Sequence, residues 1–298
     1  MMTLLEGKTV GIVGLGLIGA SLAAALRSRA VPLRRVGFDL SSDTTSKALH
    51  LGLVDVVAED LHTLCNEADI VVLAVPVLAV PGVLAAMAPH LLNGETLLTD
   101  VGSVKGSLIA AVQSVFGELP PWLVPGHPIA GGERSGVDAA NPELFARHQV
   151  ILTPHEFSDF SAIETITELW QSVGADIQMM SVERHDEVLA ATSHLPHLLA
   201  FSLVDTLAQE SEKYEIFHYA AGGFRDFTRI AASDPTMWHD IFLSNDKATL
   251  TVLDHYIEHL QGVRKALQTH DGATLKQIFT RAKKARDYFS SILEQRAR

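Results

Sequence analysis

Short apolar runs alternate with mixed, helix-like stretches along the first part of the chain, up to about Met180. The first run, Lys8–Val13 (KTVGIV), is typical of a strand that is buried on both faces of a sheet. Further strands are predicted at residues 35–38, 54–57, 69–75, 96–101, 122–126, 149–153 and 175–180. A helix is predicted to open at the capping-box sequence Ser161–Glu164 and to stop at Gly174. This alternation predicts a doubly wound α/β sheet.

The pattern changes from Ser181 onward, where glycine and proline become rare and apolar residues recur at helical spacing. One predicted helix face carries Leu250, Leu253, Ile257, Leu260, Val263 and Leu267, and another carries Leu275, Ile278, Ala282, Ala285, Phe289 and Ile292. We therefore expect two domains, an α/β domain over residues 1–179 and an all-α domain over residues 180–298. Long helices in a second domain commonly build a subunit interface, so we expect a homodimer.

One segment, Ile70–Ala88, is apolar throughout and long enough to span a bilayer. Pro76, Pro81 and Gly82 interrupt it, and a buried parallel strand followed by a proline loop and a covered helix explains it better. The first residues, MMTLLEGKTV, have neither the basic region nor the apolar core of a signal peptide. The sequence therefore predicts no membrane partner.

Composition narrows the class of protein further. The 298 residues are 47% hydrophobic, which is ample for a sizeable core. With Cys65 as its one cysteine the chain can form no internal disulfide, and we expect a cytoplasmic protein. A formal net charge of -12 argues against a nucleic-acid partner.

A glycine-rich turn, Gly14-Leu15-Gly16-Leu17-Ile18-Gly19, follows the first predicted strand and leads into an apolar helix. Gly14 would permit the tight turn, Gly16 would let the backbone approach a pyrophosphate, and Gly19 would let helix and strand pack closely. Glycines also serve ordinary turns, but here strand, turn and helix follow in the order of a Rossmann-type dinucleotide-binding domain.

The second predicted strand ends at Asp39, where an acid would bind the adenosine ribose hydroxyls. The alternative is a solvated turn aspartate. Arginine and lysine are missing from the residues directly after Asp39, and the next cation along the chain, Lys47, is too far along to hold a 2′-phosphate. The sequence therefore favours NAD over NADP.

Two further motifs stand at predicted strand ends. His127 lies in Gly126–Glu133 (GHPIAGGE), and a histidine beside a nicotinamide usually handles the proton that accompanies a hydride. Ser103, in DVGSVK, could hydrogen-bond both a substrate hydroxyl and that imidazole. The alternatives are a surface histidine, a helix cap at Ser103 and a solvated Lys105.

The helical part adds two polar clusters. The histidines of Ser193–His197 (SHLPH) have the i, i+3 spacing of a metal pair, but a cysteine or acidic third ligand is lacking, so no metal is predicted. The second cluster, GGFRDFTRI followed by SDPTMW, carries Arg225 and Arg229, which could hold a carboxylate bidentately. The alternative is a structural pairing of Arg225 with Asp226.

In order and wording these motifs resemble the prephenate dehydrogenase family, which includes arogenate and cyclohexadienyl dehydrogenases. GLGLIGASL, DVGSVK, GHPIAGGE, SHLPH and GGFRDFTRIAASDPTMW carry the resemblance, which covers nearly the whole chain. It implies an NAD-dependent oxidative decarboxylation of prephenate to 4-hydroxyphenylpyruvate in tyrosine biosynthesis. Whether prephenate, arogenate or both are accepted stays open at this stage.

The resemblance also implies roles for single residues. His127 would draw off the proton of the ring hydroxyl, Ser103 would orient His127, and Arg229 would clamp the ring carboxylate. His197 would lie near the substrate's side chain with His194 beside it, Glu133 would be an ionic or gating neighbour, and Trp238 would reach the pocket from a partner subunit. Gly222 is a further expected substrate contact, and cofactor contacts are expected at Gly14, Gly16, Leu17, Ile18, Gly19, Asp39, Val75, Pro76 and Ser103.

Two rivals remain. A β-hydroxyacid or imine-type NAD(P)-dependent reductase would need a catalytic lysine on the first interdomain helix, and residues 181–203 contain no lysine. A non-catalytic NAD-binding sensor would not need His127 and Ser103 together with Arg229. Since the chain ends soon after its helical part, we expect no regulatory domain, and we expect any tyrosine inhibition to compete with substrate at the active site.

Overall fold

The computed structural model describes residues 3–91, 94–132, 134–209 and 217–297. The chain forms two compact units that divide between Thr249 and Leu250. Strand β8 ends at Met179 and the next helix begins at Val182. The division of the chain into domains 1–179 and 180–298 remains a prediction.

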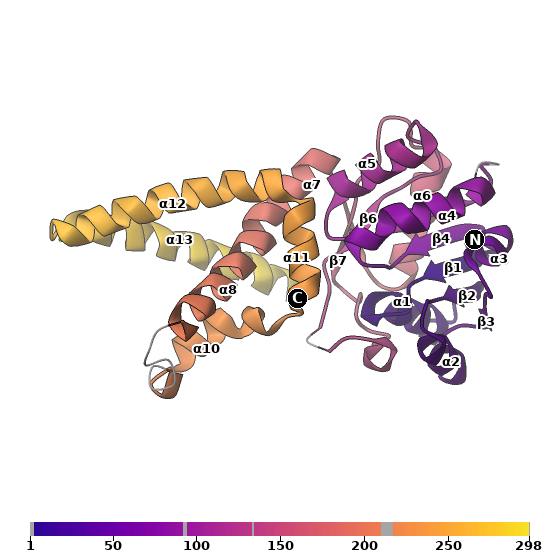
Figure 1. The fold of residues 1–298 in the computed structure, drawn as a ribbon, viewed down its shortest axis with the longest axis horizontal. Coiled ribbons are helices and arrows are strands. Elements are labelled where there is room, and N and C mark those ends of the chain that lie inside the picture. Colours follow the sequence, from indigo (N-terminus) through magenta and orange to yellow (C-terminus); the bar gives the residue numbers. More distant parts are fainter. Residues whose placement is uncertain (1–2, 92–93, 133, 210–216, 298) are drawn as a thin grey trace. The chain divides into compact units, whose positions relative to one another are not determined.

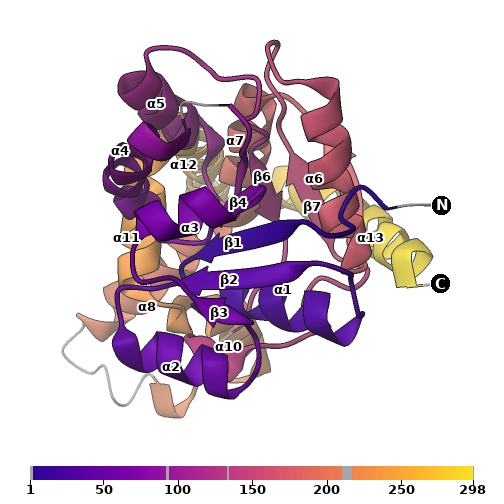
Figure 2. The ribbon, with the colours of Figure 1, turned by 90° about the vertical axis from the view of Figure 1, so that its right-hand side faces the viewer.

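A five-stranded parallel sheet organises the first unit (Figures 1 and 2). Its strands are β1 (Thr9–Val13), β2 (Arg34–Phe38), β3 (Val56–Val57), β4 (Ile70–Leu73) and β5 (Leu97–Asp100), in the order β3-β2-β1-β4-β5. The order reverses between β1 and β4, and ligands of open α/β sheets bind at the carboxyl ends of the strands beside such a reversal. The predicted Rossmann-like sheet is confirmed.

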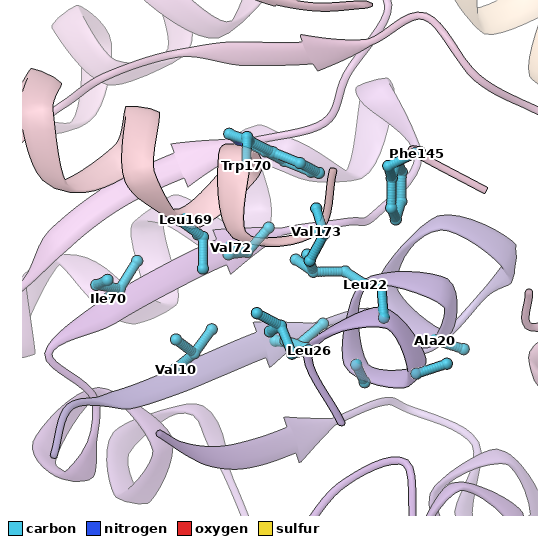
Figure 3. Close-up of a cluster of buried hydrophobic side chains, with 14 of the residues drawn as sticks. Val10, Ala20, Leu22, Leu26, Ile70, Val72, Phe145, Leu169, Trp170 and Val173 are labelled. Atoms are coloured by element: carbon cyan, nitrogen blue, oxygen red, sulfur yellow. The ribbon is translucent and has the colours of Figure 1, made fainter. Parts of the chain in front are cut away.

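Helices cover both faces of this sheet. Val10 and Ile12 of β1 point to the face covered by α1 (Leu17–Ser28) and α6 (Phe160–Ser172), where Leu22 and Trp170 complete the core in Figure 3. The other face packs against α3 (Leu61–Glu67), α4 (Val80–Leu91) and α5 (Lys105–Phe116). Helix α2 (Ser42–His50) follows β2. Strands covered on both faces explain the continuous apolar runs of the sequence.

A second sheet of three strands holds β6 (Gly126–Pro128), β7 (Gln149–Leu152) and β8 (Asp176–Met179). β6 runs antiparallel to β7, so the prediction of a single doubly wound sheet is wrong for these strands. The strand expected at 122–126 begins only at Gly126. The residues before it form one isolated parallel bridge, between Leu98 and Leu123, and the N–H of Gly126 is donated to the Asp100 side chain. A 3₁₀ turn, η2 (Val137–Ala139), lies between β6 and β7.

Two sequence details differ from expectation. Helix α6 begins one residue before Ser161, with Asp159 at its N-cap, so Ser161–Glu164 is not a capping box. The apolar run 70–88 forms β4, a 3₁₀ turn η1 (Val77–Ala79) and helix α4, as predicted. Among the described residues one helical stretch, Val182–Ala208, is long and apolar enough to cross a membrane, which is weak evidence because core helices of soluble proteins pass the same test.

That stretch consists of α7 (Val182–Leu189), a π-helical turn η3 (Ala190–His194) and α8 (Leu195–Ala208). Helix α10 (Gly222–Thr228), the 3₁₀ turn η4 (Arg229–Ala232) and α11 (Pro235–Ser244) follow. The long helices α12 (Asp246–Gln268) and α13 (Gly272–Ala297) end the chain. Large apolar side chains of these two helices are exposed in the single chain, among them Leu250, Ile257, Leu260, Leu267 and Phe289.

Candidate active site

The glycine loop between β1 and α1 has the shape of a phosphate cradle. Gly14 has a φ of +95°, and a Cβ there would lie 2.5 Å from the backbone oxygen of Ala74. At Gly19 a Cβ would lie 2.0 Å from the oxygen of Gly14, whereas at Gly16 nothing lies within 4 Å. Gly16 is the N-cap of α1, and no side chain caps that helix. The positive helix end therefore faces open space, which fits a pyrophosphate.

Asp39 follows β2 and is fixed by the backbone around it. Its Oδ2 accepts the N–H of Leu15 at 2.8 Å, and its Oδ1 accepts the N–H of Ser41 at 3.0 Å. The carboxylate thus lies beside the glycine loop, as the assignment to the ribose requires. Lys47 donates to Asp138 at 2.7 Å, so this cation is engaged elsewhere.

The loop that carries His127 also reaches the start of α1. A Cβ on Gly132 would lie 3.5 Å from Cδ2 of Leu17, on the first turn of that helix. Ala74 at the end of β4 borders Gly14, and the predicted cofactor contacts Val75 and Pro76 follow it in the chain. His127 therefore belongs to the loop cluster that surrounds the nucleotide end of the sheet.

Two buried charges hold the backbone before His127. Lys105 is fully buried; its Nζ forms an ion pair with Asp100 and donates to the oxygen of Gly126 at 2.7 Å. The Oδ1 of Asp100 accepts the N–H of Gly126 at 3.0 Å. Gly126 is thus clamped through both of its peptide groups to the end of β5. The reading of Lys105 as a solvated side chain is wrong.

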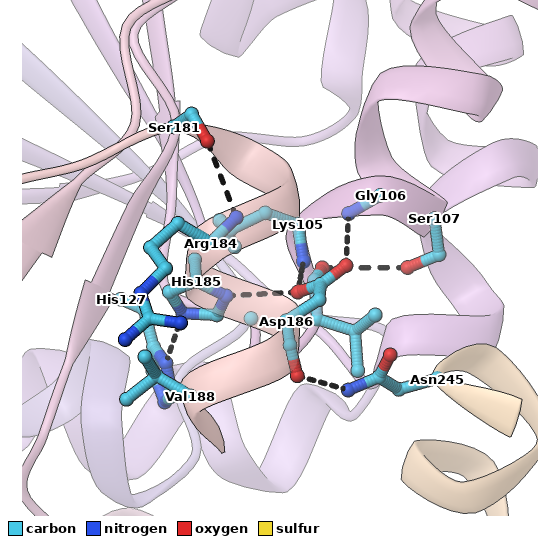
Figure 4. Close-up of polar contacts among 12 residues, drawn as sticks. Lys105, Gly106, Ser107, His127, Ser181, Arg184, His185, Asp186, Val188 and Asn245 are labelled. Atoms are coloured by element: carbon cyan, nitrogen blue, oxygen red, sulfur yellow. Dashed lines mark hydrogen bonds and ion pairs between the residues drawn. The ribbon is translucent and has the colours of Figure 1, made fainter. Parts of the chain in front are cut away.

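His127 itself is buried and hydrogen-bonded to a second histidine (Figure 4). Its Nδ1 lies 2.8 Å from Nε2 of His185, and Nδ1 of His185 lies 2.8 Å from Oδ1 of Asp186. The Asp186 carboxylate also accepts the N–H groups of Lys105 at 2.9 Å and Gly106 at 2.8 Å, at the start of α5. Within the part of the chain that the structure describes, the Nε2 of His127 has no hydrogen-bond partner.

The surroundings keep His127 neutral. Burial lowers its pKa well below 6.5, and the nearby His185, Lys105 and His194 lower it further. Burial opposes ionisation of Asp186, but the hydrogen bonds from His185 and from the N–H groups of Lys105 and Gly106 outweigh it and lower the pKa of that carboxyl. A neutral imidazole beside a fixed carboxylate can accept a proton.

The SHLPH histidines lie at the π-helical turn between α7 and α8, a distortion that is frequent at functional sites. Burial lowers the pKa of His194 to about 4, and its Nδ1 lies 3.1 Å from Nδ2 of Asn245. His197 stacks on Trp238 with 3.7 Å between ring centroids. Burial lowers the pKa of His197, and the nearby charge of Arg229 lowers it further. His194, His197, Arg229 and Trp238 are thus neighbours.

Two expectations can be compared with the single chain. Trp238 is buried there against His194 and His197, and its contribution to the pocket of a partner subunit remains a prediction. Among the described residues no hydrogen bond joins Ser103 to His127, whose Nδ1 contacts His185. The role of Ser103 in orienting the imidazole remains a prediction. Ser103 does not cap α5, because Val104 is its N-cap.

Other predicted residues lie further out or cannot be placed. Arg225 pairs with Asp226 at 3.3 Å on the exposed surface, which is the structural alternative. Gly222 begins α10 and is exposed. Glu133 lies outside the described residues. No group of three metal-ligating side chains occurs in the described ranges.

Sequence reasoning missed His185, Asp186 and Asp100. The first two stand in VERHDEV, which reads as an ordinary charged helix start. The adjacent histidine and aspartate on a helix directly after the last strand were the available signal, but their partners come from segments far away in sequence.

Comparisons with known proteins match both parts of the chain. The model of the prephenate dehydrogenase nucleotide-binding domain matches residues 22–179, and that of the prephenate dehydrogenase dimerization domain matches residues 181–281. Cyclohexadienyl dehydrogenase of Zymomonas mobilis is 43% identical over 282 residues, 94% of this chain and 95% of the relative. Prephenate dehydrogenase of Bacillus subtilis is 38% identical over 94% of this chain and 75% of its own length.

A solved structure extends the likeness to three dimensions. Prephenate dehydrogenase from Aquifex aeolicus, in complex with hydroxyphenyl propionate and NAD+, superposes with a TM-score of 0.87 at 35% identity. The superposition covers 95% of this chain and 99% of that one. Motifs, fold and relatives point the same way: the chain belongs to the prephenate dehydrogenase family.

Proposed function

We propose that the protein is an NAD-dependent dehydrogenase that oxidatively decarboxylates prephenate to 4-hydroxyphenylpyruvate, the step that leads to tyrosine. The observation that carries the proposal is the buried, neutral His127, with Nε2 free of protein partners in the described structure, in the loop cluster beside the dinucleotide cradle. The reductase alternative lacks its lysine on α7 and α8. The sensor alternative leaves the neutral imidazole without a role.

The chemistry follows from that nitrogen. Nε2 of His127 accepts the proton of the ring hydroxyl as hydride leaves the carbon that bears this hydroxyl. The bond to the ring carboxylate then breaks, carbon dioxide leaves, and the electron pair completes the aromatic ring. The phenolate oxygen takes the proton back from His127, so the imidazole is neutral again at the end of the cycle.

NAD fits the residues that are present. When bound, it supplies the acceptor for the hydride. Gly14, Gly16 and Gly19 would hold the pyrophosphate at the N-terminus of α1, and Asp39 would bind the adenosine ribose. Since Lys47 is paired with Asp138, it does not offer a charge to a 2′-phosphate, and we expect the protein to prefer NAD over NADP.

The substrate end is assigned to the cluster around the π-helical turn. Arg229 would bind the ring carboxylate, and His197, stacked on Trp238, would lie near the side chain. His194 would line the same wall. Ser103, Gly222 and Glu133 are further proposed contacts. One hydrogen bond from these side chains to the substrate, on the order of 1–3 kcal/mol, would be enough to set a preference between prephenate and arogenate.

Three proposals concern the protein as a whole. The exposed apolar side chains of α12 and α13, together with the match to a dimerization domain, support a homodimer. Tyrosine, which resembles the product, would compete with prephenate, so it should raise KM and leave kcat unchanged. Cys65 is buried and burial raises the pKa of its thiol to about 11, which fits a structural thiol in a reducing, cytoplasmic setting.

The proposal is tested by the formation of NADH from NAD with prephenate and arogenate supplied in parallel to the purified protein. Turnover of prephenate supports it, and the ratio of kcat/KM values gives the side-chain preference. Tight NAD binding without turnover of either substrate would favour the sensor.

A further inference from the structure

His127 is the first of three side chains that hydrogen bonds join in a row, and the last of the three is a carboxylate. His127, His185 and Asp186 are joined by two contacts of 2.8 Å, and His185 is fully buried. A catalytic base needs only one nitrogen facing substrate, so the second nitrogen and its partners require a separate explanation. His127 lies on β6, and His185 and Asp186 lie on α7 (Figure 4).

The hydrogen positions on these three side chains can be assigned by starting from Asp186. Asp186 is held ionised by the N–H groups of Lys105 and Gly106, so it can only accept, and Nδ1 of His185 must donate to it. When Nδ1 carries the single ring hydrogen of His185, its Nε2 is bare and accepts the N–H on Nδ1 of His127. That leaves Nε2 of His127 without a hydrogen and able to take a proton.

We propose that His185 and Asp186 are positioning residues that fix the tautomer of His127 and compensate the charge it gains when it accepts the substrate's proton. The inference rests on the proposed function for its kinetic consequence, but the tautomer itself can be measured without substrate. In Ser-His-Asp triads a carboxylate acts directly on the catalytic histidine by the same two effects.

Other charged groups near His127 do not supply this control. Lys105 of α5 faces it with a positive charge, which is balanced by Asp100 of β5. His194 of the π-helical turn has its Nδ1 engaged by Asn245. Asp186 is therefore the anion that hydrogen bonds connect to His127 through His185.

The test uses Asp186→Asn, which keeps size and shape but removes the charge. With the amide oxygen toward His185, the NH₂ group faces the N–H of Gly106, and in the flipped orientation the NH₂ group faces His185 and the N–H of Lys105. The two orientations favour opposite tautomers of His185, so its proton is no longer fixed on Nδ1. We expect ¹⁵N NMR of the NAD-bound enzyme to show His127 as a mixture of tautomers, and kcat to fall about 10- to 100-fold while KM for NAD stays unchanged.

Asp240→Asn is the matched control. Asp240 pairs with the preceding residue, His239, at 2.9 Å in the same i, i+1 arrangement, but on α11 and outside this chain of hydrogen bonds. The Asp240→Asn variant should have the same ¹⁵N spectrum of His127 and the same kcat as the parent protein.

His185→Gln separates positioning from a structural role of Asp186 at the start of α5. The glutamine side chain can turn either its oxygen or its NH₂ group toward Nδ1 of His127. Its orientation therefore does not depend on the charge of Asp186. In this background Asp186→Asn should have no further effect on kcat. An equal loss of kcat in both backgrounds, or an unchanged His127 tautomer in Asp186→Asn, would overturn the proposal. Because the tautomer is read without turnover, a protein inactive on prephenate would contradict only the proposed function.

Discussion

At the scale of single residues, the working state of His127 is set by its surroundings and not by its own chemistry. Burial together with three neighbouring positive or titratable groups lowers its pKa, so the neutral form persists below the usual histidine range. The motif around His127 was recognisable in the sequence. Its burial and its contact with His185 were not, because they depend on a helix that follows 58 residues later.

This low pKa predicts the acid side of the pH profile. We expect kcat/KM for prephenate to stay level from about pH 8 down to 6.5, and to fall only at lower pH as His127 becomes protonated. Measurement of initial rates across this range checks it. A half-maximal kcat/KM at or above pH 6.5 would show that burial does not lower the pKa of His127 as described.

His194 predicts a pH dependence of stability. Its pKa is about 4 in the folded chain and 6.5 when unperturbed, so the unfolded chain binds more protons between these values. Stability should therefore decline as pH falls from 6.5 to about 4, by at most about 3 kcal/mol from this residue. His194→Asn, which keeps an acceptor for Asn245, should show a smaller decline in urea unfolding; an identical decline would contradict this assignment.

At the scale of elements, the apolar runs and glycine positions predicted the five-stranded sheet, since a strand covered on both faces has a distinctive sequence. The second sheet could not be predicted in the same way. Its first strand is three residues long and antiparallel, and its first residue, Gly126, is held by hydrogen bonds from Lys105 and to Asp100. Local sequence patterns do not encode such long-range contacts.

The glycine loop offers a comparison of two substitutions. Gly16→Ala introduces a methyl group into open space at a φ of -69°, so the thermal midpoint should not change, while KM for NAD should rise at least about tenfold, or about 1.4 kcal/mol. Gly14→Ala is strained by its φ of +95° and its contact with Ala74, and should also destabilise the fold by about 1–3 kcal/mol. Thermal unfolding and NAD titration separate the two, and equal stability losses would argue against this geometry.

At the scale of the whole molecule, the exposed leucines of α12 are the feature that a single chain leaves unexplained. Leu250 is 54% and Leu260 is 47% exposed, and such a stripe normally meets a second surface. The heptad-like spacing predicted the helices, but not which apolar residues would stay uncovered.

If this stripe forms a dimer interface, Leu260→Glu should shift the protein toward monomer in sedimentation velocity runs. His259→Glu, one position away on the same helix, adds the same charge without removing the apolar side chain and should leave the dimer intact. A monomeric parent protein, or equal effects of both substitutions, would remove the basis for the homodimer.

The central claim is that His127 is the base of an NAD-dependent dehydrogenase, and one measurement tests it most directly. Prephenate-dependent NADH formation should be compared between the parent protein and His127→Asn, with NAD binding measured for both. We predict a kcat lower by about 10²- to 10⁴-fold with NAD affinity retained. A variant that turns over prephenate at the parent rate, or a parent that binds NAD and never reduces it, would contradict the account.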